Sequence, residues 1–422
     1  MLIDLEPLRT SRDFRLLWLG ELVSQTGSHI ALVAVYVQVF ALTDSVAAVG
    51  LVGLVQLVPL ALASILGGPL IDRYDRRKLL LIGEVGAVAS SGVLLAGAAA
   101  GEPPLAVVYL GAALVSLFSG FSLSARSSML PNLVPSKLLP SALSLNQAMF
   151  STTLIVGPAV GGVIIDEVGL AWAYGVDVAS FTAAIAACVL LRSQIPTPGP
   201  ETEAREARGG AIAAGWQQVT EGFHFLRGRR VLQSSFYVDL VAMVFGMPRA
   251  LFPVLAVTQF DSGSKTVGVL FSAVSVGALL GALTAGWVKR VERQGLAVLW
   301  AVAVWGLGIV GFGLSGGVLE LALGCLAVAG AADVVSAVFR GTILQDSVPD
   351  SLRGRMSAVH ILVVVGGPRI GDVEAGLVAA LFTPVISVVT GGVACIAGVV
   401  VLALAVPEFA QYRAPRAVDP AG

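Results

Sequence analysis

Hydrophobic residues occur along this chain in long runs, which short polar or charged stretches separate. A helix that crosses the hydrocarbon core of a bilayer needs about 20 mostly apolar residues. Runs of this length recur from one end of the sequence to the other. The pattern predicts twelve membrane-spanning helices, over residues 14–41, 46–70, 79–100, 105–127, 141–165, 171–191, 232–258, 266–288, 296–315, 320–343, 356–382 and 386–406.

Basic residues between the predicted helices fall on one side of the membrane. An even number of helices places both termini on the same side, and cytoplasmic loops carry an excess of Lys and Arg. Basic residues precede the first helix and lie between the sixth and seventh, whereas Lys265 is the only one in the opposite loops. We therefore expect both termini in the cytoplasm. One miscounted helix would disrupt this asymmetry, so it also supports the helix count.

A hydrophilic segment, residues 192–230, separates the sixth and seventh predicted helices. Its first part is rich in proline, glycine and charge, as flexible linkers are. Its second part places Trp216, Val219, Phe223 and Leu226 at helical spacing. This predicts an amphipathic helix, either on the membrane surface or packed on the cytoplasmic ends of the helices. We expect six-helix bundles at 1–191 and 231–410, a cytoplasmic linker at 192–230 and a cytoplasmic tail at 411–422.

Composition agrees with an all-α membrane protein. The chain has 422 residues, of which 56% are hydrophobic and 13% charged, whereas soluble domains carry about 25% charged residues. The net charge of −1 does not indicate a nucleic-acid-binding surface. Cys188, Cys325 and Cys395 each lie inside an apolar run, without metal-ligand spacing or a disulfide framework. No signal peptide is expected at the N-terminus, and the first apolar run should remain as a helix.

A charged turn, residues 68–78, joins the second and third predicted helices. Gly68 allows two helices to approach closely. Asp72 can accept hydrogen bonds or lie at the N-terminus of a neighbouring helix, where the helix dipole favours an anion. Arg73, Arg76 and Arg77 hold the turn on the cytoplasmic side. The spacing resembles the loop motif G-x-L-x-D-R-x-G-R-R-K of the major facilitator superfamily, and this resemblance implies a gating role.

The fifth predicted helix contains a second motif, formed by Gly157, Pro158, Gly161 and Gly162. Glycines four residues apart give a flat face for close helix packing. The cluster resembles the antiporter motif G-P-x-x-G-G of exporters in the same superfamily. A simple packing face is the alternative reading, and the resemblance favours export over uptake.

Further segments, including Asp13–Trp18 and Leu352–Met356, resemble the branch of the superfamily that contains enterobactin exporters and macrolide-efflux proteins. That branch has twelve helices in two six-helix repeats of the same orientation. Two sequence offsets agree with such a repeat. A pattern of Arg, Leu, Val, Pro and Leu after the fourth helix recurs after the tenth, 214 residues later (340 − 126). Gly68 and Gly286 are 218 residues apart (286 − 68).

Charged residues inside the predicted helices are the candidates for coupling or substrate contact, because charge within a bilayer is costly. These candidates are Glu21, His29, Arg249, Asp333, Arg369, Asp372 and Glu374. The family resemblance implies that helices 1, 4, 7 and 10 line the cavity, which favours Glu21, Arg249 and Asp333. Arg369 and Asp372 are three residues apart and can pair locally.

For some charged residues a structural reading stands beside the functional one. His29 is equally consistent with a cavity group and a satisfied core histidine. Arg126 and Arg340 lie near cytoplasmic helix ends, where an arginine can extend its head to the interface. Asp177 lies on a helix that the resemblance places at the periphery.

No enzyme motif is present: the chain lacks H-E-x-x-H, G-x-S-x-G and a P-loop. Without a nucleotide site, pumping would use an ion gradient, and we take protons as the ion. The sequence predicts a proton-coupled exporter (an antiporter) of a large amphiphilic molecule, such as a siderophore or hydrophobic drug, working by alternating access in the bacterial inner membrane.

Two alternatives remain within transport, namely broad multidrug efflux and proton-coupled uptake. A transporter-like receptor or lipid-handling protein without net pumping is the alternative of another class. The expected partners are a small-molecule substrate, protons and membrane lipids, with no nucleic acid, metal or cofactor. We expect a monomer.

Overall fold

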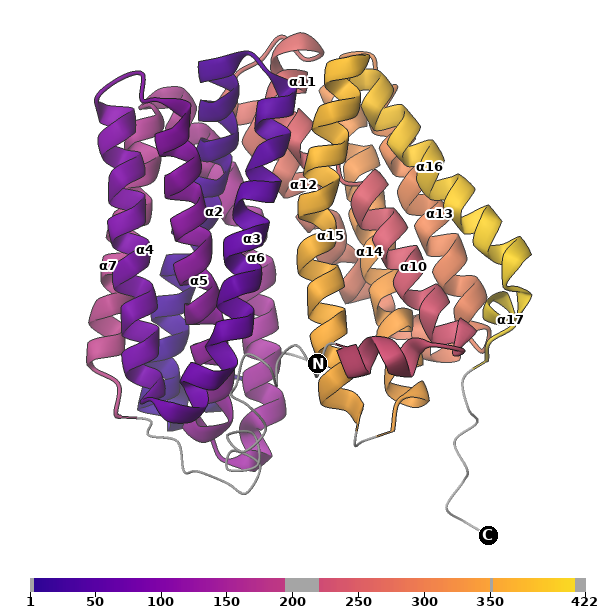
Figure 1. Cartoon of the computed structure of the whole chain (residues 1–422), viewed down its shortest axis with the longest axis horizontal. Helices are drawn as coiled ribbons and strands as arrows, with labels where there is room; N and C mark the ends of the chain where they lie inside the picture. Colours follow the sequence, from indigo (N-terminus) through magenta and orange to yellow (C-terminus); the bar gives the residue numbers. More distant parts are fainter. Residues whose placement is uncertain (1–3, 194–219, 350–351, 414–422) are drawn as a thin grey trace. The chain divides into compact units, whose positions relative to one another are not determined.

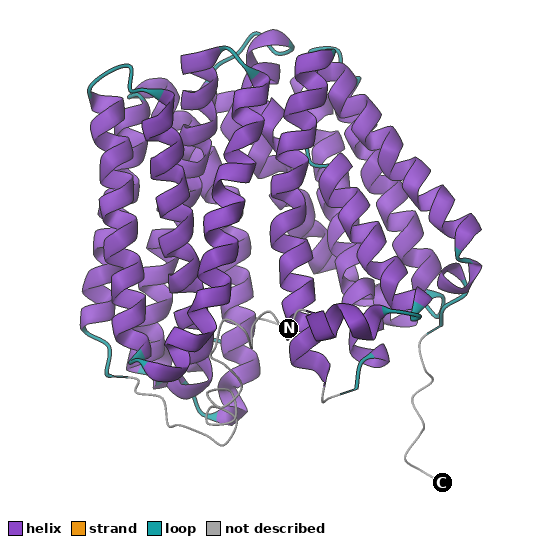
Figure 2. Cartoon of the chain, in the orientation of Figure 1, coloured by secondary structure: helices purple, strands orange, loops and turns teal. Residues whose placement is uncertain are grey.

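A computed structural model describes residues 4–193, 220–349 and 352–413. Within these ranges the side chains of a few helical residues, including Gly68 and Asp72, lie outside the description. The described elements are all helical (Figure 2). The α-helices are α1 (Glu6–Thr10), α2 (Arg12–Thr43), α3 (Val46–Arg73), α4 (Arg76–Ala99), α5 (Leu105–Leu133), α6 (Leu139–Glu167), α7 (Leu170–Val189), α10 (Arg230–Phe245), α11 (Phe252–Thr258), α12 (Ser264–Thr284), α13 (Gln294–Gly313), α14 (Leu319–Ser347), α15 (Arg353–Leu381), α16 (Pro384–Ala405) and α17 (Pro407–Ala410). Short 3₁₀ turns are η1 (Ser136–Leu138), η2 (Arg249–Leu251) and η3 (Ala285–Arg290).

Polar side chains at helix starts supply hydrogen bonds that the first turn cannot make internally. Ser11 Oγ accepts from the amide of Phe14 at 3.1 Å, and this cap begins α2. Ser45 caps α3 and Thr383 caps α16 in the same way. At the other end of α2 the chain turns at Asp44, which adopts a left-handed conformation with φ 48°. Local sequence therefore sets several of the helix boundaries.

Eleven segments in the described part of the chain are long and apolar enough to cross a membrane. The remaining long helix is α15, with 29 residues, which carries Arg369, Asp372 and Glu374. The prediction of an all-helical membrane protein is confirmed. The arrangement of twelve spans in two bundles stays a prediction.

By their contacts the residues form two compact units, Met1–Trp216 with Phe252–Ser272, and Gln217–Leu251 with Ala273–Gly422. We call them the first and second units. The contacts group Phe252–Ser272 with the first unit. The domain limits predicted at residues 191 and 231 stay a prediction. Of the predicted linker helix, residues 220–226 are helical, whereas Trp216 and Val219 lie outside the described residues.

In the first unit, α2 packs along α6 and α7, α4 packs on α5 and α7, and α3 packs on α5 (Figure 1). An apolar cluster that includes Phe14, Met129 and Leu145 fills the region between α2, α5 and α6. Arg76 and Arg77 of the charged turn bind to this unit's own helices. Arg76 donates to the carbonyl of Ser128 at 3.0 Å, and Arg77 donates to the carbonyl of Cys188 at 3.0 Å.

In the second unit, α13 packs along α14 and α16, and α10 packs on α15 (Figure 1). Trp305 and Phe312 of α13 are fully buried. Backbones of α12 and α14 approach closely where Gly277 faces Ala327 and where Gly330 faces Val274, so any Cβ at either glycine would collide with a carbonyl group. Small residues are the usual means of close helix contact in a membrane.

Ser11→Ala should destabilise the first unit. Besides capping α2, Ser11 Oγ donates to the carbonyl of Leu133 at 2.6 Å, joining the start of α2 to the end of α5. We expect a cost of about 1 kcal/mol or more, seen as a lower melting temperature of the purified protein in detergent. Thr10→Ala, which removes only a local helical hydrogen bond at an exposed site, is the control. Equal melting temperatures for the two variants would contradict the assignment.

Candidate functional site

A buried ion pair joins α2 to α5 in the first unit. Arg126 binds Glu21, and the side chains are 14% and 9% exposed. Gln25, one turn along α2, donates to Glu21 Oε1 at 2.8 Å. The interfacial position suggested for Arg126 is therefore wrong. Its guanidinium neutralises a carboxylate inside the protein, because an ionised group is far cheaper to bury when it is paired.

A related cluster joins α10 to α14 in the second unit. Arg340 binds Asp239, and the two side chains are 9% and 3% exposed. Arg340 Nη2 also lies 3.7 Å from Asp333 Oδ1 on its own helix. Arg340 is thus an interior group as well, which corrects the second interfacial assignment. One guanidinium serves two carboxylates here, and the second of these, Asp333, is 31% exposed.

The two clusters occupy equivalent sequence positions. Arg126 and Arg340 differ by 214 residues, and Glu21 and Asp239 differ by 218 (239 − 21). These are the two offsets that relate the sequence repeats. Each unit therefore builds the same arginine–carboxylate pair from corresponding helices. Sequence reasoning singled out Glu21 but missed Asp239 as its counterpart, although the repeat offset carried the signal.

A third buried pair lies in the second unit. Arg249 of η2 donates to Asp372 Oδ2 of α15 at 3.0 Å. Asp372 is fully buried, and Arg249 is 24% exposed. The sequence offered a local pair between Arg369 and Asp372, and the structure adds a partner from another element. Asp372 thus holds η2 against α15.

Three candidates remain, namely Glu374, Arg369 and His29. Glu374 and Arg369 are half-buried on α15. His29 lies beside Phe150, with ring centroids 6.4 Å apart. Its Nε2 is buried without a hydrogen-bond partner among the described residues. The choice between a cavity group and a core histidine stays open for His29.

The glycine-rich motif of α6 forms packing faces in the first unit. Gly157 lies against His29, and Gly161 lies against Ile30, whose Cα would be 3.0 Å from an added Cβ. Gly162 faces α12, where an added Cβ would be 2.6 Å from the carbonyl oxygen of Ser264. Pro158 is buried within the same helix. The packing reading accounts for all of these contacts, and the antiporter role stays a prediction.

The charged turn is described only in part. Asp75 Oδ1 accepts from the amide of Arg77 at 3.0 Å and so begins α4. Arg73 is exposed at the end of α3. The side chains of Gly68 and Asp72 lie outside the described residues, so the gating role of the motif stays a prediction.

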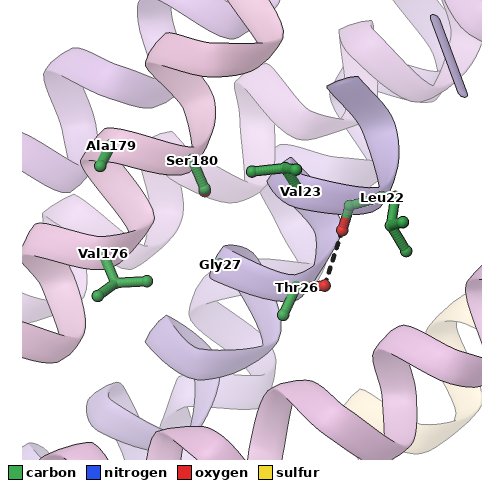
Figure 3. A pocket seen from close by; sticks show the side chains of 7 residues that line it. All are labelled: Leu22, Val23, Thr26, Gly27, Val176, Ala179 and Ser180. Atoms are coloured by element: carbon green, nitrogen blue, oxygen red, sulfur yellow. Dashed lines mark hydrogen bonds between the residues drawn. The ribbon is translucent and has the colours of Figure 1, made fainter. Parts of the chain in front are cut away.

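An open groove lies between α2 and α7 (Figure 3). Its volume is about 380 Å³, and its walls are mostly apolar. The lining residues are Leu22, Val23, Thr26, Gly27, Val176, Ala179 and Ser180. The hydroxyl of Thr26 is satisfied by the carbonyl of Leu22 at 2.7 Å. No group of three or more His, Cys, Asp or Glu among the described residues could hold a metal ion.

The sequence matches the family described as transmembrane secretion effector over residues 4–419. The chain belongs to this family. The match spans nearly the whole chain and confirms the resemblance to the major facilitator superfamily.

Curated relatives include the enterobactin exporter EntS of Citrobacter koseri, 28% identical over 98% of this chain and 96% of the relative. The enterobactin exporter EntS of Shigella boydii is also 28% identical, with the same coverage. These relatives are transporters and not enzymes, as the sequence predicts. Together with the apolar helices, they identify a multi-pass protein of the bacterial inner membrane.

Solved structures with the same fold include a peptide transporter POT, with a TM-score of 0.77, 12% identity and 96% coverage of both chains. Another is a POT family transporter in complex with 5-aminolevulinic acid, with a TM-score of 0.74 and 11% identity, which covers 94% of this chain and 97% of its own. At such low identity these similarities show the fold alone.

Arg126→Gln should destabilise the first unit strongly, because it leaves Glu21 buried without its cation. Breaking a buried pair by removing one partner costs about 3–5 kcal/mol. Thermal unfolding in detergent should show a large loss, and Glu21→Gln combined with Arg126→Gln should recover most of it. Arg192→Gln, at a side chain that is 82% exposed, should change little. A double variant no more stable than Arg126→Gln would show that the pair is not the cause.

Proposed function

We propose that this protein is a proton-coupled exporter of a large amphiphilic small molecule, of the siderophore or hydrophobic-drug class. Membership of the secretion effector family and the similarity to enterobactin exporters over 98% of the chain support transport out of the cell. The proposal includes twelve spans, of which α15 is the twelfth, and cytoplasmic termini. The positive-inside pattern of the loops supports this orientation.

The cluster of Asp239, Arg340 and Asp333 in the second unit supports the proposal of proton coupling. Two carboxylates share one guanidinium, so the cluster has an unbalanced negative charge when both are ionised. Asp239 is the better buried and the better paired of the two. Asp333 is partly exposed and more distant from Arg340, so it is the group that can gain or lose a proton.

Protonation of Asp333 changes the charge of a membrane-embedded cluster from negative to neutral. A proton drives a conformational change only if it binds one conformation better than the other. The neutral cluster is cheaper to enclose in a low-dielectric interior, whereas the charged cluster favours access to water. Proton binding would therefore favour a conformation in which Asp333 is enclosed, and release would favour one in which it is hydrated. This supplies the coupling step for alternating access.

Transport into proteoliposomes tests the function. Purified protein in liposomes is given an imposed pH gradient with a catecholate siderophore or a hydrophobic dye, and accumulation is measured on the acidic side. We expect gradient-driven accumulation that collapses when a protonophore dissipates the gradient. Protein-free liposomes correct for passive partition of the substrate. Equal accumulation with and without the pH gradient would overturn the antiport proposal.

Asp333→Asn should uncouple export from the pH gradient, because it fixes the cluster in a neutral state. Coupling free energies of about 1–3 kcal/mol correspond to changes of about 5- to 150-fold. The rate of gradient-driven export should therefore decrease by a factor of about 5 to 150. Its residual rate should lose its dependence on pH, and downhill exchange of substrate should persist.

Asp346→Asn is the matched control, since Asp346 is exposed on the same helix. It should keep the wild-type pH profile. A wild-type profile in Asp333→Asn would remove Asp333 from the coupling mechanism.

A further inference from the structure

Two carboxyl groups lie in the interior of the first unit, apart from the ion pairs described above. Glu84 of α4 is 3% exposed and Asp177 of α7 is 0% exposed. Among the described residues neither forms a salt bridge, in contrast to Glu21, Asp239 and Asp372. The sequence did not predict a functional role for either residue.

Hydroxyl groups from neighbouring helices surround the two acids. Ser91 of α4 donates to Asp177 Oδ2 at 2.6 Å. The hydroxyls of Ser24 of α2 and Ser122 of α5 lie against the carboxyl group of Glu84. Four helices of the first unit therefore contribute polar atoms to this cluster, which we call the interior acid pair.

One oxygen of each acid has no hydrogen-bond partner among the described residues, namely Glu84 Oε2 and Asp177 Oδ1. A small space adjoins Glu84, with a volume of about 10 Å³. That volume is about the lower limit for one water molecule. Its walls come from α2, α4 and α7 and include Glu21 and Cys188. The unpartnered oxygens and this space point to a bound species of very small size.

The charges around the interior acid pair do not neutralise it. From α2 the facing group is Glu21, and from α5 the nearby cation is Arg126, but these two already bind each other. From α7, besides Asp177, the facing groups are Cys188 and Tyr174, whose hydroxyl donates to Gln38 at 2.7 Å. Arg77 of α4 donates to carbonyls at the end of α7. Each described cation near the acids is thus engaged elsewhere.

An ionised carboxylate at either position would be costly, because burial of an unpaired charge is expensive. A divalent cation would require more ligands, since Ca²⁺ takes about 6–8 oxygens. The described residues also contain no group of three acidic, His or Cys side chains. A proton needs only one oxygen as its ligand and a neighbouring acceptor.

We propose that Glu84 and Asp177 are proton-binding groups in the interior of the first unit, separate from Asp333, with the small space beside Glu84 holding the water through which Glu84 exchanges its proton. In this site a carboxyl oxygen gains the proton as an O–H bond, and a neighbouring hydroxyl or water oxygen accepts a hydrogen bond from it. The proposal does not depend on the direction or the substrate of transport.

Infrared difference spectroscopy of the whole protein in lipid tests the site directly. A protonated carboxylic acid has a carbonyl stretch separate from the carboxylate bands, and the band shifts in D₂O. In the Asp333→Asn background, which removes any band from Asp333, we expect such a band at neutral pH, its partial loss when Glu84→Gln or Asp177→Asn is added, and its complete loss when both are added. Glu320→Gln, at an exposed residue in the first turn of α14, should retain the full band.

The spectrum of Asp333→Asn, in which Asp333 contributes no band, decides the question even if a Glu84 or Asp177 variant fails to fold. A band that disappears on alkaline titration and returns on acidification supports the site. No carboxylic-acid band at neutral pH, or an undiminished band in the folded double variant, would overturn it. Removal of the band by Na⁺ at constant pH would show a sodium site instead and would also overturn it. Failure of gradient-driven export would leave these bands unchanged, so the two proposals fail separately.

Discussion

Charge inside a membrane has to be neutralised within the protein, and one arginine–carboxylate pair in each unit shows how this chain does so. Glu21 with Arg126 and Asp239 with Arg340 join corresponding helices, α2 to α5 and α10 to α14. Removal of one partner would leave a buried charge without its main counter-ion. The pairs therefore fix which helix faces turn inward, and the other polar groups are arranged around that constraint.

In lipid the hydrophobic effect does not drive helices together, so their association depends on close packing. Hydrocarbon tails are as apolar as leucine, so helices associate through van der Waals contact and hydrogen bonds. The glycines of α6 bring its backbone against α2 and α12, and Gly277 and Gly330 do the same for α12 and α14. The glycine motif of α6, which resembles the antiporter motif, thus also packs the helices closely. Any side chain larger than hydrogen would disturb this packing.

Beside the arginine–carboxylate pair of each unit lie further interior acids, and both proton-binding proposals rest on them. In the second unit Asp333 is the additional acid beside Arg340, and it is partly exposed. In the first unit Glu84 and Asp177 lie among serine hydroxyls and are almost completely buried. The two proposed sites differ in their access to water. Asp333 would exchange protons with water directly, whereas Glu84 and Asp177 would need a water molecule inside the bundle.

The sequence by itself determined the helical fold class, the approximate spans and the family, because hydrophobic run length, loop charge and local motifs are properties of contiguous residues. It also contained the offsets that relate Arg126 to Arg340 and Glu21 to Asp239. Only the tertiary structure decided which charges meet. Arg126 and Arg340, near helix ends in the sequence, turn inward to carboxylates, and Asp372 finds Arg249 more than 100 residues away. Helix rotation and the choice of partner depend on packing against other helices, and a linear hydropathy pattern does not contain that information.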